Sequence, residues 1–142
     1  MKYQLHDSIG FRVNQTANIV NNQFSKVLKK YNIAPEQRAT LEIIKYEENV
    51  NQTKIAQILG KDKTTVSRGL KTLENKNLIY KKQIDKRTNI IKLTKLAEEI
   101  LENSCKEVQS FRDNLISSLN KEEINLLHQL INKITNNIEK RV

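Results

Sequence analysis

The stretch "DKTTVSRGL", residues 62–70, predicts a short helix with two chemically different sides. Val66 and Leu70 fall on one side of that helix, and Leu73 continues the same side one turn later. The opposite side carries Thr64, Arg68, Lys71 and Asn75. A solvated helix face usually mixes both charge signs, whereas this one begins with hydroxyls and cations and no acid. We therefore expect the apolar side to anchor the helix on a domain and the polar side to contact a partner.

The residues upstream predict a second helix, which would precede the first in a helix-turn-helix. Asn51 can cap it by accepting a hydrogen bond from a free backbone N–H. Gly60 can end it, because glycine takes the left-handed conformation at no steric cost. Asp62 then caps the following helix, where its negative charge opposes the positive end of the helix dipole. The expected buried side of the upstream helix is formed by Ile55, Ile58 and Leu59.

Downstream of the opening stretch, the sequence predicts two short strands joined by a polar turn. We expect the helix to stop at Asn77, since asparagine tolerates the left-handed conformation. Residues 78–84 and 89–94 are rich in Ile, Leu and Tyr and have the character of strands, with "DKRT", residues 85–88, as the turn. Lys86 and Arg87 at its tip have two interpretations. Polar tips are normal in any hairpin, but a wing could also insert an arginine into the minor groove of DNA.

The positive charge of the chain is confined to this part of the sequence. Residues 51–95 hold 12 of the 25 lysines and arginines but only three of the 16 acids. The rest of the chain holds 13 of each, so the net charge of +9 belongs entirely to this segment. Charge that is segregated in this way favours a polyanionic partner over a role in solubility alone.

Amphipathic helices are predicted on both sides of the basic segment. Apolar residues recur at helical spacing over residues 5–31, 35–46 and 94–119. Asn120 and Glu123 resemble a capping box that begins a last helix. The terminal helices carry more apolar surface than a small domain can cover. We expect a second copy of the chain to cover it, and the alternative is a three-helix bundle within one chain.

Composition and isolated reactive residues narrow the class of protein. One Pro and three Gly in 142 residues favour a helical single domain. A single cysteine and the absence of a signal peptide or a long apolar run predict a cytoplasmic protein with no membrane association. Cys105 lies on an apolar helical stripe, so we interpret it as a small buried hydrophobe rather than a redox sensor. His6 and His128 lack companion ligands, so we expect no metal or cofactor.

No motif in the chain indicates a catalytic reaction. The sequence has no Gly-rich phosphate loop, no nucleophile elbow and no paired Cys/His site. We therefore expect a binding protein and not an enzyme.

Residues 55–94 resemble the winged helix-turn-helix of the MarR family of bacterial transcriptional regulators. The resemblance rests on Leu59-Gly60, on "TVSR" at residues 65–68, and on the wing pattern "DKR" at 85–87 followed by Leu93-Thr94. Pro35, Gln37 and Leu41 resemble the family's second helix, and the long flanking helices match its dimerisation region. The chain departs from the family pattern at Asn77 and Ala97, where glycine is common, and at Ala34, where a hydroxyl cap is usual.

The resemblance implies a homodimer that binds a pseudo-palindromic operator, usually as a repressor. In many relatives a phenolic ligand or cysteine oxidation releases the DNA. In the family's wing the aspartate orients the arginine, which the resemblance carries over to Asp85 and Arg87.

The sequence thus predicts a mainly α fold with a small β-hairpin wing. A winged helix-turn-helix DNA-binding domain is expected at residues 33–95, flanked by helical dimerisation regions at 1–32 and 96–142. The expected function is a sequence-specific regulator of transcription that binds double-stranded DNA, and the alternative is a winged helix that docks RNA or a protein. The expected partners are DNA, a second copy and a small-molecule effector. The expected DNA contacts are Thr53, Lys63, Thr64, Thr65, Ser67, Arg68, Lys71, Lys86, Arg87 and Thr88.

Overall fold

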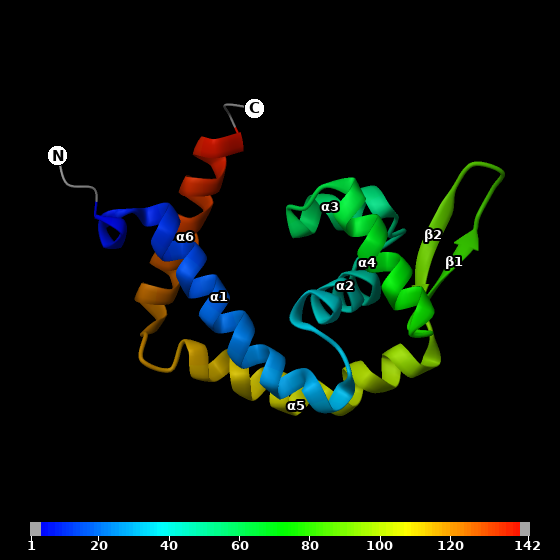
Figure 1. Ribbon diagram of the computed structural model, residues 1–142, viewed down its shortest axis with the longest axis horizontal. Coiled ribbons are helices and arrows are strands. Elements are labelled where there is room, and N and C mark those ends of the chain that lie inside the picture. The colour runs from blue at the N-terminus through cyan, green and yellow to red at the C-terminus, as the bar shows by residue number, and fades with distance from the viewer. Residues whose placement is uncertain (1–3, 140–142) are drawn as a thin grey trace. The chain divides into compact units, whose positions relative to one another are not determined.

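The computed structural model describes residues 4–139, which form two compact units, one up to Lys106 and one from Glu107 onward. The first unit contains α1 (Ile9–Leu28), α2 (Pro35–Tyr46), α3 (Gln52–Leu59) and α4 (Lys63–Asn75), followed by the strands β1 (Ile79–Gln83) and β2 (Asn89–Leu93) (Figure 1). Helix α5 (Lys95–Leu115) begins in the first unit and ends in the second, which also contains α6 (Lys121–Glu139). This order of helices with one hairpin confirms the predicted mainly α, winged helix-turn-helix fold class.

The residues predicted to cap α3 and α6 do so in the structure. Asn51 Oδ1 accepts from the Lys54 N–H at 2.8 Å and begins α3, and Gly60 ends that helix with φ +67°. The Asn120–Glu123 box begins α6, with hydrogen bonds of 2.8 and 3.0 Å. Helix α4 ends at Asn75, two residues before the expected stop, and Asn77 takes the left-handed conformation.

The long helix expected over residues 5–31 is interrupted. A 3₁₀ turn over Leu5–Asp7 precedes α1, and a second one over Lys29–Tyr31 follows it. Ser8 separates the first turn from α1 because its side chain caps the helix, accepting from the Phe11 N–H at 3.3 Å.

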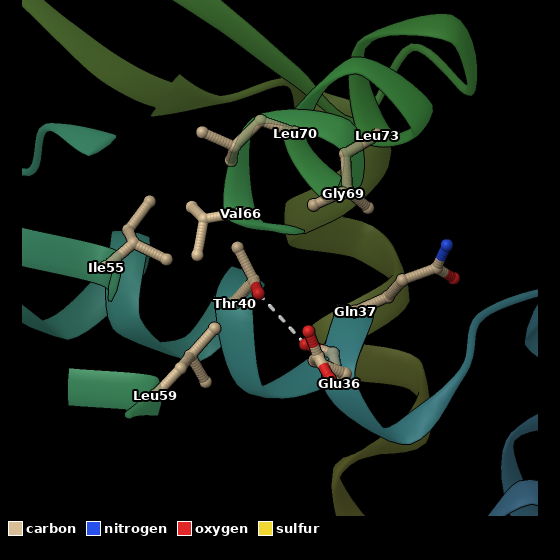
Figure 2. Close-up of a pocket in the computed structure, with 9 residues that line it drawn as sticks. All are labelled: Glu36, Gln37, Thr40, Ile55, Leu59, Val66, Gly69, Leu70 and Leu73. Atoms are coloured by element: carbon tan, nitrogen blue, oxygen red, sulfur yellow. Dashed lines mark hydrogen bonds between the residues drawn. The ribbon is translucent and has the colours of Figure 1, made fainter. Parts of the chain in front are cut away.

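The core that positions α4 lies between α2, α3, α4 and the hairpin. Leu41, Ile55 and Leu73 are among its fully buried side chains. A cavity of about 60 Å³ remains between the three helices, bordered by Thr40 of α2 and Gly69 of α4 (Figure 2). The prediction for α3 is wrong at Ile58, which is 47% exposed. The inward stripe of α3 consists of the buried Ile55 and Ala56 and the half-buried Leu59, so Ile58 lies outside it.

The buried side of α5 differs from the prediction at Cys105. It consists of Ala97, Leu101, Ser104 and Val108, at helical spacing. Cys105 is one residue, about 100° around the helix, from that stripe and is exposed, so its interpretation as a buried hydrophobe is wrong. The helix ends at Leu115 and not near Leu119, because residues 116–118 form a turn.

Apolar side chains remain exposed on two helices. In α1, Ile9, Val13 and Ile19 are more than half exposed. In α6, no residue that the structure describes is buried. Its apolar residues Leu126, Leu127, Leu130, Ile131, Ile134 and Ile138 are between 40 and 61% exposed. None of the helices within residues 4–139 combines the length and apolarity that a membrane span needs.

Candidate nucleic-acid interface

Helix α4 presents its polar face to solvent because its other face is fixed in the core. Val66, Leu70 and Leu73 are 1–4% exposed, as the sequence predicts. The helix begins at Asp62, whose Oδ1 accepts from the Thr65 N–H at 2.7 Å. That hydrogen bond lowers the pKa of Asp62 below its ordinary value, so the cap is an anion at neutral pH. The exposed residues in the first half of the helix include Lys63, Thr64, Thr65, Ser67, Arg68 and Lys71.

Strands β1 and β2 form a hairpin whose turn is held by one carboxylate. The strands pair antiparallel, with Ile79 opposite Leu93 and Gln83 opposite Asn89. At the tip, Asp85 Oδ1 accepts from the backbone N–H groups of Arg87 at 2.9 Å and Thr88 at 2.8 Å. The hydrogen bond from Arg87 is the main cause of the lowered pKa of Asp85.

These two hydrogen bonds suggest how Asp85 could orient Arg87, the role that the family resemblance implies. The carboxylate bonds the backbone at Arg87 rather than the guanidinium, so it fixes the turn that carries the arginine. The side chains of Lys86, Arg87 and Thr88 are exposed.

A depression between the N-terminus of α3 and the hairpin brings distant residues together. Thr53, Arg87 and Thr88, which the sequence analysis selected separately, all line it. Its volume is about 380 Å³, and sequence reasoning missed four of its polar lining residues, Asn51, Gln52, Lys81 and Asn89. Asn51 had been selected only as a helix cap, and the position of the others depends on the hairpin packing beside α3. Lys86 is not among the lining residues of this depression.

The first turns of α3 and α4 are also joined. Gln52 Nε2 donates to the backbone oxygen of Lys63 at 3.1 Å. The hydroxyls near the start of α4 and the depression at the start of α3 are therefore held in a fixed relation.

The cations of this region divide into those with partners and those without. Three lysines form ion pairs. Lys54 Nζ lies 3.6 Å from Glu47 Oε2, Lys61 Nζ lies 3.6 Å from Glu36 Oε2, and Lys81 Nζ lies 3.8 Å from Glu74 Oε1. By contrast, within residues 4–139 no side-chain hydrogen bond or ion pair engages the cationic groups of Lys63, Arg68, Lys71, Lys86 and Arg87. The lysines and arginines selected from the sequence as DNA contacts are thus free to bind an anion, and so, within the described residues, are Lys82, Lys92 and Lys95 of the same basic segment.

The arrangement has the chemistry of a duplex-binding surface. A helix that enters the major groove reads base edges with residues near its N-terminus, where this chain has hydroxyls and an arginine. A hairpin that carries an arginine at its tip can reach the narrower minor groove. Unpaired cations between the two can neutralise phosphates and release their counterions.

Comparisons with known proteins agree with this geometry. A family model described as MarR family matches residues 33–88. The HTH-type transcriptional regulator MgrA of Staphylococcus aureus is 33% identical over 139 residues, covering 94% of this chain and 91% of that protein.

Solved structures share the fold over nearly the whole chain. A MarR/EmrR family transcriptional regulator from Acinetobacter sp. ADP1 superposes with a TM-score of 0.90 at 26% identity, covering 97% of this chain and 99% of that one. The S. aureus MepR–DNA complex gives a TM-score of 0.83 at 22% identity, with 92% and 96% covered.

Proposed function

Because the chain belongs to the MarR family of transcriptional regulators, we propose that it represses transcription by binding a specific double-stranded operator. The observation that carries the proposal is the separation of charges in α4 and the hairpin. Lys63, Arg68, Lys71, Lys86 and Arg87 are exposed and unpaired within the described residues, whereas Lys54, Lys61 and Lys81 have acidic partners. Arg68 and the hydroxyls before it would read bases, and Arg87 would enter the minor groove.

The proposed active form is a homodimer on a pseudo-palindromic operator. Half-sites one helical turn, about 34 Å, apart require two copies of α4 with a fixed separation. The exposed apolar side chains of α1 and α6 support this part of the proposal, since a second copy would remove them from water. Domain boundaries at residues 33–95, with dimerisation regions before and after, belong to the same proposal.

The proposal assigns no enzymatic activity to the protein. It places the protein in the cytoplasm, where the chromosome is. A small phenolic effector that releases the DNA is part of it and rests on the family resemblance alone. Thermal unfolding in the presence of phenolic acids, read as a concentration-dependent rise in melting temperature, would identify such a ligand.

The deciding experiment is to sequence the genomic fragments that the purified protein retains. The enriched sequence, expected to be an inverted repeat, is then made as a duplex for fluorescence anisotropy. We expect it to bind at least about 1000-fold more tightly than a random duplex at physiological salt. Equal affinity for both duplexes, or tighter binding to single-stranded RNA of the same length, would favour the alternative of an RNA- or protein-docking winged helix.

A further inference from the structure

A buried polar cluster joins α2 to α5 within the first unit. Arg38 of α2 is 4% exposed and Ser104 of α5 is 0% exposed. Arg38 Nη1 donates to Ser104 Oγ, and its Nε donates to Glu42 Oε1 at 3.3 Å. Arg38 Nη2 lies 3.3 Å from the same carboxylate oxygen. Ser104 Oγ in turn donates to the backbone oxygen of Ile100 at 2.6 Å, so the hydroxyl is engaged as both donor and acceptor.

This cluster occupies a stripe of α5 that is otherwise apolar. Ala97 and Leu101 on the same stripe are 0% and 4% exposed. Replacing a buried charged pair with apolar residues of similar volume is often neutral for stability, because desolvation offsets the attraction. A hydrogen bond nevertheless fixes a direction and a length, which apolar packing does not. We therefore expect the cluster to affect the relative orientation of α2 and α5 rather than the net stability of the protein.

A second contact attaches to the same turn of α5. Tyr31 Oη donates to the backbone oxygen of Asn103 at 3.2 Å, next to Ser104 in the chain. The segment that follows α1 and the first half of α2 are thus both bonded to one turn of α5. Because α3 packs on α2 and α4 packs on α3, the angle of α2 on α5 also sets the direction of α4 (Figure 1).

We propose that Arg38 and Ser104 are positioning residues that fix the angle between the α2–α4 core and α5, and thereby set the half-site spacing that the dimer accepts. The second half of this statement rests on the function proposed above. Adjacent base pairs are about 3.4 Å apart along the duplex, so a small rotation at α5 displaces α4 by a whole base pair. The discrimination between spacings then depends on a directional bond rather than on a DNA contact.

The first test replaces both partners at once, with the double variant Arg38→Met/Ser104→Ala. Removing both polar groups leaves neither Arg38 nor Ser104 buried without a partner, and the Glu42 carboxylate, which also loses Arg38, is 23% exposed and can bind water, so we expect the fold to be retained. The matched control is Thr40→Val. Thr40 is 6% exposed and donates to the backbone oxygen of Glu36 at 2.9 Å, so this change also removes a buried hydroxyl from α2, but beside α3 and α4 (Figure 2).

The affinity of each protein is measured for the operator identified from the retained genomic fragments. It is also measured for operators with one base pair inserted or deleted between the half-sites. We expect the wild type and Thr40→Val to lose about tenfold or more on the altered spacings, and the double variant to lose about threefold or less. The single variant Ser104→Thr, which keeps the hydroxyl and leaves Arg38 in place, should keep most of the wild-type ratio of affinities between the operator and the operators with altered spacing. A double variant with the wild-type ratio and only a lower melting temperature would show a merely structural role and overturn the proposal.

The second test needs no DNA. Spin labels are placed at Gln57→Cys on α3 and Glu102→Cys on α5, both exposed, in a Cys105→Ser background. The labelled chain is diluted with unlabelled protein, so that distances within one chain dominate. We expect one narrow distance distribution in the otherwise wild-type chain and in Thr40→Val, and a broad one in the double variant.

Equal distributions in all three proteins would overturn the positioning role, whether or not the chain binds an operator. A broadened distribution in a protein that prefers no DNA sequence would instead refute the proposed function and leave the positioning role standing.

Discussion

Helices α4 and α6 have comparable amphipathic patterns but opposite burial. The apolar residues Val66, Leu70 and Leu73 of α4 are 1–4% exposed, whereas the six apolar residues of α6 from Leu126 to Ile138 are 40–61% exposed. The core around α4 is complete within one chain, so its polar face is available for a ligand. The apolar side chains of α6, in contrast, stay exposed among residues 4–139. The same periodicity thus accompanies a buried apolar face in α4 and an exposed one in α6, and the proposed homodimer would cover the second.

The largest expected effect is on α6. Ile131→Glu would place an unpaired charge in the proposed dimer interface, which costs several kcal/mol when buried. We expect the mass in light scattering to fall from twice the 16.6 kDa chain mass to the chain mass at micromolar concentration. Operator affinity should then fall by more than about 100-fold, since both half-sites can no longer be bound together.

The neighbouring variant Asn132→Glu adds the same charge to a polar position of α6 and serves as the control. If both variants remain dimeric, the exposed stripe of α6 is not the interface, and the contrast between α6 and α4 has another cause.

The next effect divides the polar face of α4 by role. Arg68→Ala should cost about 1–3 kcal/mol on the operator and little on random DNA, because an arginine that reads a base contributes to specificity. Lys71→Ala should weaken both duplexes alike and lower the salt dependence by about one unit per contact in each subunit, as expected for a phosphate contact. Affinities for operator and random duplexes at several salt concentrations distinguish the two outcomes. An Arg68→Ala protein with wild-type operator affinity would mean that this face is only solvated.

The helix caps and the pairing of the lysines differ in how far they could be predicted from the sequence. Caps at Asn51 and Asp62 depend on residues three positions away, so local chemistry was sufficient to predict them. The free or paired state of a lysine depends on residues distant in sequence. Lys61, for example, lies beside Glu36 of α2, and sequence alone does not separate it from the unpaired Lys63.

The error on α5 has a similar origin. Cys105 and Ser104 are neighbours, and hydrophobicity favours burial of the cysteine. In the structure Ser104 is buried, because Arg38 of a distant helix supplies its hydrogen bond. No periodic pattern contains that information, since the partner is defined only by the packing of α2 on α5.

A smaller effect is expected at the hairpin. Asp85→Ala removes the acceptor of two backbone N–H groups, including that of Arg87, so the arginine is held less firmly. Operator affinity should fall, but by less than in Arg87→Ala, and the double variant should be no weaker than Arg87→Ala alone, because both changes act through one contact. Additive losses would instead mean that Asp85 acts independently of Arg87.

The pH dependence of this turn follows from the lowered pKa of Asp85. A carboxyl whose pKa is depressed by folding stabilises the folded form fully above its ordinary pKa of 3.8. That contribution is lost only as the pH falls through the lower, folded value. The loss caused by Asp85→Ala should therefore be the same at pH 6, 7 and 8. A loss that changes over this range would require a different titrating group.

The smallest expected effect has the opposite sign and tests how firmly α4 is held. Gly69 is interior to α4, and a Cβ added there meets no atom within 4 Å. Gly69→Ala should therefore stabilise the protein by about 1 kcal/mol and raise the melting temperature by about 2–4 °C. Gly60→Ala is the matched control. A Cβ at Gly60 is equally free of contacts, but φ is +67°, so this change should destabilise the protein. Thermal unfolding of the two variants isolates backbone conformation from packing. If Gly69→Ala is stabilised yet binds the operator less tightly, the glycine serves close approach of α4 to DNA. If it is destabilised, α4 is not the independently completed helix that its contrast with α6 implies.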